Sequence, residues 1–285
     1  MGRLHHLKET LPVNIRDNTR PGDPEVEFVI VNYNSPDGLE DWIKSDPEMN
    51  AWMRQGIITY AKYKDASHFR HAHAKNMAHR LASGNIVCNL DADNFTGPGF
   101  ASFIAQKMSP DPHASVLHAD FRFLQGISIK DAGFFGRIAL SRENFMRMGG
   151  YDESFRGWGG EDNNMIVRAF SFGLKSAKID NPAFLRIISH EHEERLQHIN
   201  PAERAEGLKK IKASENIFTA QSLRQRFNDV SGWAQVNAKG FGMGTLYVGP
   251  KAREVLLLPM ICKPSNRPAI LGLPSYAKAY IASLK

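Results

Sequence analysis

Residues 86–93 (IVCNLDAD) form an apolar, partly β-branched run that ends in two aspartates. A short apolar run of this kind is typical of a strand buried on both faces, and it predicts a strand over residues 85–90. Apolar residues recur at helical spacing within residues 71–82, so we expect a helix before this strand. Asp91 and Asp93 therefore stand where a buried strand ends.

Strand and helix patterns alternate through the first half of the chain. Residues 26–31 and 57–60 are typical of strands, and residues 39–44 predict a short helix between them. This order favours parallel strands joined by right-handed crossovers. Because open sheets bind ligands at the carboxyl ends of their strands, we expect residues 32–34 and 91–93 at the same rim of one sheet.

The second half of the chain continues the alternation. We expect one domain over residues 1–285, with its core over about 26–192 and a helical or irregular extension over about 200–285. The expected elements are strands over 114–117, 136–140, 174–179 and 184–188, a short helix capped by Ser141, a helix from Glu161 to Gly173, and a helix from Pro201 to about 227.

The composition is that of a folded protein. With 285 residues, 42% of them hydrophobic, the chain can bury a sizeable core. No apolar run approaches the roughly 20 residues that span a bilayer, and residues 1–8 lack the hydrophobic core of a secretory signal. Cys88 and Cys262 are its two cysteines. We therefore expect a cytoplasmic protein, with peripheral contact at the inner face of the membrane left open.

The net charge of +6 is spread along the chain. Basic residues could attract nucleotides, acidic glycans or anionic lipids, and an ordinary solvated surface is the alternative. Since zinc-ligand cysteine spacing and RNA-binding aromatic motifs are both missing, we expect no nucleic-acid partner. The densest basic region comprises Arg224, Arg226, Lys251, Arg253, Lys263 and Arg267.

A glycine–tryptophan segment, residues 149–164 (GGYDESFRGWGGEDNN), combines three useful features. Its glycines let the backbone approach a ligand closely, and Trp158 offers a flat apolar platform for a sugar ring. Glu161 and Asp162 provide carboxylates, one of which could take a proton from an attacking hydroxyl. The alternative is structural, because acidic residues in a first helical turn complement the helix dipole.

Asp91 and Asp93 are the candidate metal ligands. Chance alone predicts about one such pair in a chain of this composition, and a capping turn is the ordinary alternative. However, two carboxylates at the end of a buried strand repel each other unless a cation is present, and their hard oxygens suit Mg²⁺ or Mn²⁺. His190 follows an apolar run and can complete the site, with His192 as the alternative; both could instead be surface residues.

Together these motifs resemble the GT-A glycosyltransferases. Residues 91–93 look like their Asp-x-Asp motif, and residues 158–162 look like the Trp-Gly-Gly-Glu-Asp motif of the β-1,4-galactosyltransferases. Tyr33-Asn34 matches the end of the first strand in family 2 glycosyltransferases. The resemblance covers about residues 26–192. It implies an α/β, Rossmann-like GT-A fold with a mixed, mostly parallel sheet flanked by helices.

The resemblance also implies roles for individual residues. The donor would be a nucleotide sugar, most simply a UDP-sugar, whose diphosphate is bridged by Mn²⁺ (or Mg²⁺) to Asp93. Ile187 stands where the galactosyltransferases have a metal-ligating Met, so coordination differs here. The implied assignments are Asp91 and His190 at the metal, with Asp91 also near the ribose, Asn32, Asn34 and Asp65 at the uridine, Lys75 at phosphate, Trp158, Gly159 and Gly160 at the acceptor, and Asp162 with Glu161 in catalysis.

These assignments give a metal-dependent, inverting glycosyltransferase acting on a glycan hydroxyl. Aspartate after Glu161 favours inversion, and the expected setting is synthesis of a bacterial-type surface glycan from the cytoplasmic side. One alternative is a retaining enzyme similar to the polypeptide N-acetylgalactosaminyltransferases. Another is an inactive protein that binds a glycan or a nucleotide.

Overall fold

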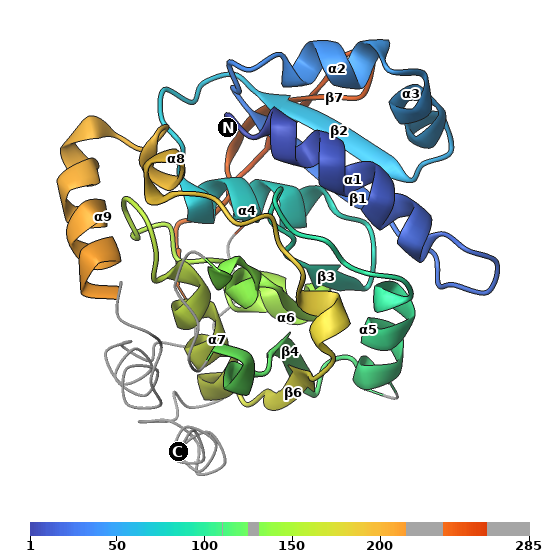
Figure 1. Ribbon diagram of the computed structural model, residues 1–285, viewed down its shortest axis with the longest axis vertical. Helices are drawn as coiled ribbons and strands as arrows, with labels where there is room; N and C mark the ends of the chain where they lie inside the picture. The colour runs from blue at the N-terminus through green and yellow to red at the C-terminus, as the bar shows by residue number, and fades with distance from the viewer. Residues whose placement is uncertain (110, 125–130, 215–235, 261–285) are drawn as a thin grey trace.

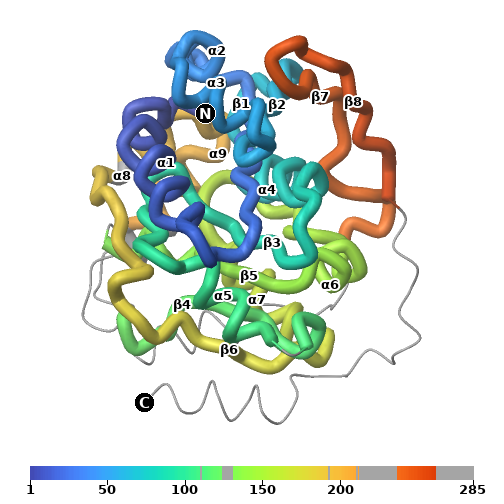
Figure 2. Tube along the Cα trace, turned by 90° about the vertical axis from the view of Figure 1, so that its right-hand side faces the viewer, coloured from blue at the N-terminus to red at the C-terminus, as the bar shows by residue number. Residues whose placement is uncertain are grey.

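The computed structural model describes residues 1–109, 111–124, 131–214 and 236–260. Its strands form two four-stranded sheets, one above the other in Figure 2. The first sheet has the order β1 (Phe28–Tyr33), β2 (Ile58–Tyr63), β7 (Gly244–Val248) and β8 (Arg253–Leu257). The second has the order β3 (Ile86–Cys88), β5 (Ile138–Ser141), β4 (Ser115–Ala119) and β6 (Lys175–Ile179).

Helix α4 (His71–Leu81) packs on the first sheet through Ala74, Met77 and Leu81, and three N-terminal helices pack there as well. They are α1 (Leu4–Asn18), α2 (Leu39–Ser45) and α3 (Pro47–Arg54), and their apolar side chains join those of β1 and β2 in one core cluster. The sequence sets the start of α3: the Asp46 carboxylate accepts hydrogen bonds from two first-turn N–H groups, and Pro47 takes the first helical position.

The second sheet carries the larger core. The remaining helices are α5 (Phe100–Met108), α6 (Arg142–Arg147), α7 (Glu161–Ser171), α8 (His192–Leu196) and α9 (Pro201–Ser214). Short 3₁₀ helices are η1 (Phe121–Leu124), η3 (Gly133–Gly136) and η4 (Pro182–Leu185). Helices α5, α6 and α7 surround this sheet in Figure 1, and their apolar residues are buried against it. As expected, Ser141 caps α6, since its hydroxyl accepts from the Asn144 N–H.

The expected α/β class and mixed sheet are confirmed, but parallel strands are not the majority. Among the described strands, only β1–β2 and β4–β6 pair in parallel, and four pairs are antiparallel. Strand β5 runs against both of its neighbours, and β7–β8 is a hairpin. The expectation that β1 and β3 share one sheet is also wrong, since they fall in different sheets.

The strand expected over residues 184–188 is not formed. Pro182 fixes its φ angle, and the Asn181 side chain accepts from the Ala183 N–H, so the chain turns into η4. Only Ile187 pairs, in an isolated antiparallel bridge with Asn94. That single bridge joins the segment before His190 to the turn that carries Asp91 and Asp93.

The C-terminal region is more regular than expected. Hairpin β7–β8 extends the first sheet, because β7 pairs with β2 (Figure 2). Helix α9 begins at Pro201 as expected, and residues 215–227 of the expected helix lie outside the described residues.

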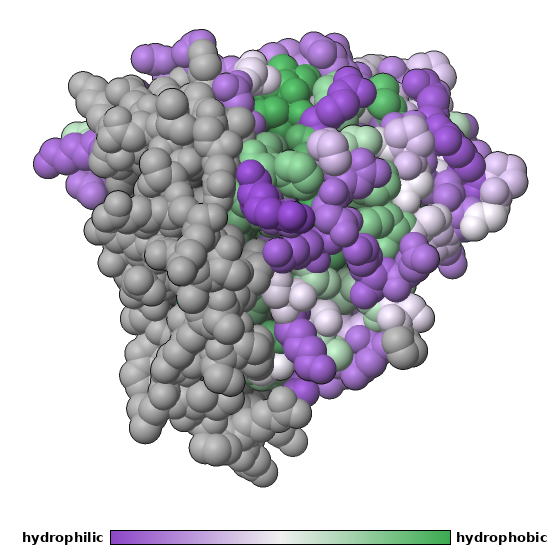
Figure 3. All heavy atoms as spheres, turned by 60° about the horizontal axis from the view of Figure 1, so that its bottom comes forward, coloured by the Kyte–Doolittle hydropathy of each residue, from purple (hydrophilic) through white to green (hydrophobic). Residues whose placement is uncertain are grey.

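Within the described part of the chain, no helix has the length and apolar character needed to cross a membrane. Figure 3 shows a face on which hydrophilic and apolar residues are interspersed across the coloured surface. In the basic region, Lys251 and Arg253 are exposed at the β7–β8 turn. The other basic residues named above lie outside the described residues.

Candidate active site

One cavity of about 390 Å³ gathers most of the residues singled out in the sequence. Its walls come from α1, β1, α4, the turn after β3, η3, the glycine–tryptophan segment and the region around α8. The expected site residues that line it are Lys75, Asp91, Asp93, Trp158, Gly159, Gly160, Glu161, Asp162 and His190. Segments far apart in the sequence therefore build one site.

The aspartate turn after β3 is held from the side by α1. Within the turn, the Asn94 N–H donates to the Asp91 carbonyl at 3.0 Å. From α1, the Thr10 hydroxyl donates to the Ala92 carbonyl at 2.7 Å, and the Asn14 amide donates to the Asn94 carbonyl at 2.8 Å. Helix α1 thus supplies buried polar groups that hold the turn in place.

The isolated bridge brings His190 to the same turn. Ile187 pairs with Asn94, and the Ile188 N–H donates to the Asp93 carbonyl at 2.8 Å. Two residues later, His190 Nε2 lies 2.7 Å from Asp93 Oδ2. Burial opposes ionisation of Asp93, but His190, Arg3 and Asn94 together lower the pKa of that carboxyl.

This donor set fits a divalent cation. Two carboxylates and an imidazole, from Asp91, Asp93 and His190, line one cavity, and such oxygen and nitrogen ligands suit Mn²⁺ or Mg²⁺. His190 Nε2 and Asp93 Oδ2 are in contact, and Asp91 reaches the same cavity from the turn after β3. His192 begins α8, and its side chain lies outside the described part of the chain.

Gly136 separates the Asp91 side of the cavity from the Asp162 side. A Cβ atom on Gly136 would lie 2.9 Å from Asp162 Oδ2 and 3.1 Å from Asp91 Oδ2. Both carboxylates thus pack directly against its Cα. The Asn89 side chain fixes the arrangement by donating to Asp91 Oδ1 at 3.1 Å and to the Gly136 carbonyl at 3.0 Å.

Lys75, from α4, pairs with both carboxylates at the start of α7. Its Nζ lies 2.7 Å from Asp162 Oδ1 and 3.1 Å from Glu161 Oε1. The Glu161 side chain is buried, and those of Lys75 and Asp162 are mostly buried. Burial and the charges of Glu161 and Asp91 raise the pKa of Asp162 above its usual range, although Lys75 opposes this. Burial also opposes ionisation of Glu161, but the charge of Lys75 and its hydrogen bond lower the pKa of that carboxyl.

The glycine–tryptophan segment supplies the wall opposite α4. Gly160 precedes α7 with φ of 104°, and a Cβ there would lie 2.8 Å from the Phe155 ring, so glycine is required. The Gly157 N–H donates to the Glu203 carboxylate of α9 at 2.9 Å. Trp158 packs against the apolar cluster of α8 and α9 and lines the cavity. Helices α8 and α9 therefore hold the segment in place, and the Trp158 indole lines the cavity.

Three expected donor-binding residues do not line this cavity. Asn32 is fully buried, and its amide donates to the Tyr60 hydroxyl at 2.9 Å. Asn34 donates to the Ala66 carbonyl at 2.9 Å, and Asp65 is exposed to solvent. Lys75 lines the cavity, but its ammonium group is paired with carboxylates, where the sequence had suggested phosphate.

Other cavity residues were not singled out in the sequence. Arg3 and Glu194 come from α1 and α8, and Gly136 comes from η3. His71 is half-buried, and its buried Nδ1 atom has no hydrogen-bond partner among the described residues. Burial lowers the pKa of His71, so its ring is a neutral hydrogen-bonding group at the cavity.

Comparison with known proteins supports this fold. A family model described as the N-terminal domain of galactosyltransferase matches residues 125–194. A validoxylamine A glucosyltransferase of Streptomyces hygroscopicus subsp. limoneus is 26% identical over 215 residues, which are 59% of this chain and 46% of that protein. β-1,4-Galactosyltransferase 2 of Cricetulus griseus is 31% identical over 108 residues, which are 37% of this chain and 29% of that protein.

The chain thus spans less than half the length of these curated relatives. A solved structure, the mannosyltransferase PcManGT from Pyrobaculum calidifontis in complex with GDP-Man and Mn²⁺, aligns with a TM-score of 0.51 at 17% identity, covering 79% of this chain and 69% of that one. The chain has the GT-A glycosyltransferase fold and resembles the β-1,4-galactosyltransferases in its glycine–tryptophan segment.

Proposed function

We propose that the protein is a metal-dependent, inverting glycosyltransferase that moves a sugar from a nucleotide-sugar donor to a glycan hydroxyl. The observation that carries the proposal is the meeting of two groups in one cavity. One is the metal-ligand set of Asp91, Asp93 and His190, and the other is Asp162 beside Trp158. The similar Pyrobaculum calidifontis mannosyltransferase was solved with GDP-Man and Mn²⁺, which supports the same classes of donor and ion.

In this proposal, the residues at the start of α7 and in the glycine–tryptophan segment bind and activate the acceptor. Trp158 stacks on the acceptor sugar, and Gly159 and Gly160 let it approach the backbone. Asp162 accepts the proton of the attacking hydroxyl at Oδ1 or Oδ2. Its raised pKa suits this task, since a base whose pKa lies near the working pH transfers protons efficiently. Lys75 holds the carboxylate in place, and Glu161 shares the lysine charge.

Asp91, Asp93 and His190 would hold the divalent ion. When bound, the ion neutralises the negative charge that develops on the departing nucleoside diphosphate. Neutral His71 offers its free Nδ1 to a donor or acceptor hydroxyl. A UDP-sugar remains our preferred donor on the galactosyltransferase resemblance, and a GDP-sugar is the alternative.

A donor screen tests the proposal. Purified protein is incubated with Mn²⁺, a panel of UDP- and GDP-sugars and a mixture of glycan acceptors, and nucleotide release is measured. We expect release with one donor class, its loss with EDTA, and recovery with added Mn²⁺. Nucleotide binding without turnover across the whole panel would instead indicate an inactive binding protein. NMR of the anomeric proton of the product then separates inversion from retention.

A further inference from the structure

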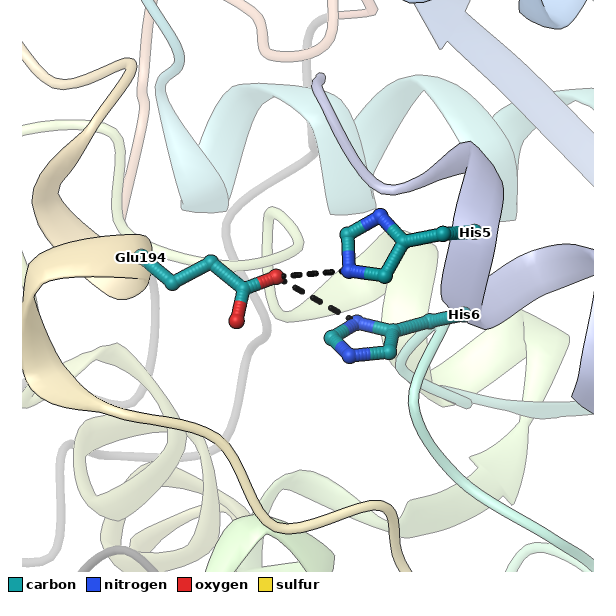
Figure 4. A group of neighbouring side chains, drawn as sticks. All are labelled: His5, His6 and Glu194. Carbon is teal, nitrogen blue, oxygen red and sulfur yellow. Dashed lines mark ion pairs between the residues drawn. The ribbon is translucent and has the colours of Figure 1, made fainter.

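Helices α1 and α8 bring a second group of possible metal ligands together beside the cavity. His5 and His6 lie in the first turn of α1 and point toward Glu194 of α8 (Figure 4). His5 Nε2 lies 2.9 Å and His6 Nδ1 3.7 Å from Glu194 Oε1. The three candidate ligand atoms all lie within 4.8 Å of one another.

The chemistry of this group suits a borderline cation. Two imidazole nitrogens and one carboxylate oxygen are a frequent ligand set for zinc sites that keep one position open. The His5 and His6 rings are 4.0 Å apart at their centroids, and the His6 side chain is buried.

Glu194 provides independent support. Its Oε1 atom is buried, and the cationic or imidazole groups of Arg3, His5 and His6 all converge on it without a hydrogen bond of acceptable geometry among the described residues. The same carboxylate lines the cavity, and its other oxygen lies 3.8 Å from His190 Nδ1. The group is therefore adjacent to the Asp91–Asp93–His190 set but shares no residue with it.

We propose that His5, His6 and Glu194 bind a second divalent cation, zinc by their chemistry, at the rim of the cavity. This site does not depend on the glycosyltransferase assignment, since its ligands are defined by geometry alone. A cation here joins the first turn of α1 to α8 and so braces two walls of the cavity.

Arg3 gives the proposal a distinctive consequence. Its Nη1 atom lies 2.5 Å from Glu194 Oε1 and 3.4 Å from His6 Nδ1, so the guanidinium competes for the same carboxylate and imidazole. A metal ion must displace it. Removing Arg3 should therefore tighten metal binding, whereas in a purely ionic network Arg3 would be the only cation needed.

The test titrates the full-length, metal-free protein with Zn²⁺ against a chromophoric chelator, and with Co²⁺ to record its absorption bands. We expect His5→Ala and Glu194→Gln each to weaken Zn²⁺ binding by at least ~10-fold, and Arg3→Ala to strengthen it. His68→Ala, a histidine change outside the group, should leave it unchanged. Asp93→Asn should leave Zn²⁺ at this site while Mn²⁺ binding is lost.

The proposal is overturned if His5→Ala and Glu194→Gln bind Zn²⁺ as the wild type does, or if Arg3→Ala weakens binding. Misfolding does not confuse the result, because the His5 side chain is 59% exposed and its removal leaves the core intact. Equal thermal unfolding of His5→Ala and wild type without metal confirms this. Because no activity is measured, failure of this proposal is distinguishable from failure of the proposed function.

Discussion

The Asp162 end and the Asp93 end of the cavity both pair carboxylates with a basic side chain, but the partners differ in kind. Lys75 is a permanent cation that reaches both Glu161 and Asp162 from α4. His190 is an imidazole that meets Asp93 from a loop held by one β-bridge. An imidazole can give up its proton and ligate a metal, whereas an ammonium group cannot.

This contrast indicates that the two ends of the cavity have different chemical roles. At the Lys75 end, α4 and α7 face each other, and the lysine charge favours the ionised form of both Glu161 and Asp162. The His190 side can exchange its contact with Asp93 for a contact with a cation. Substitutions at the two ends should therefore have different consequences, and the predictions below test that difference.

The largest expected effect is on turnover at the Asp162 end. Asp162→Asn should lower kcat/KM by ~10³-fold, because the amide cannot accept the hydroxyl proton, while the affinity for nucleotide in the presence of Mn²⁺ stays the same. Steady-state kinetics and isothermal titration with UDP measure the two quantities. Near-normal turnover in this variant would remove Asp162 from the role of base.

The second effect is on stability and on pH dependence. Lys75→Gln should lower the free energy of unfolding by about 3 kcal/mol, because two buried carboxylates lose their cation. The pKa of Asp162 is raised to about 7 and Lys75 lowers it, so activity in this variant should require a higher pH. In wild type, kcat/KM should rise as Asp162 ionises with increasing pH. In the variant, this rise should move upward.

Chemical denaturation and a pH profile at saturating Mn²⁺ check both parts. A bound cation beside Asp91 removes part of the repulsion that raises the pKa of Asp162. The wild-type rise should therefore move to lower pH as Mn²⁺ is increased. A pH profile that is identical in wild type and variant would contradict the assigned electrostatics.

Gly136 tests whether the two ends depend on a common spacing. Gly136→Ala places a Cβ within 3.1 Å of carboxylate oxygens of both Asp91 and Asp162, so at least one must move. Such overpacking costs about 1–3 kcal/mol, and if that cost falls on the transition state, we expect a loss of kcat/KM of about 5- to 160-fold. A loss of Mn²⁺ affinity would indicate that Asp91 has moved, and a loss of kcat with unchanged Mn²⁺ affinity would indicate that Asp162 has moved. Gly84→Ala, where a Cβ would approach only the Ile86 carbonyl at 3.4 Å, is the control outside this cavity.

The sequence predicted the site better than it predicted the sheet. Asp91, Asp93 and Asp162 could be found because carboxylates at strand ends and helix starts leave a local signature. The membership of β1 and β3 in different sheets could not, because strand pairing depends on distant segments such as β7. Hairpin β7–β8 is separated from its partner β2 by most of the chain.

Helix α1 shows the same limit within the site. Nothing local to Thr10 or Asn14 indicates that their side chains hold the aspartate turn, since the partners are about 80 residues away. The requirement for glycine at position 136 could not be predicted from the sequence either, because it arises only where the distant Asp91 and Asp162 carboxylates come together. Lys75 was expected at phosphate because pairing it with Asp162 required the relative position of α4 and α7.

The smallest expected effect is at the Asp93 end. His190→Gln should cost only about 1 kcal/mol of stability in metal-free protein, since a glutamine amide can still donate to Asp93 and the Asn94 amide already does so. Its consequence should appear on adding Mn²⁺: the wild-type melting temperature rises, and that of the variant does not. Lys75→Gln, the matched substitution, should melt lower without metal but keep the Mn²⁺-dependent rise. If both variants responded to Mn²⁺ alike, the exchangeable partner would not be His190.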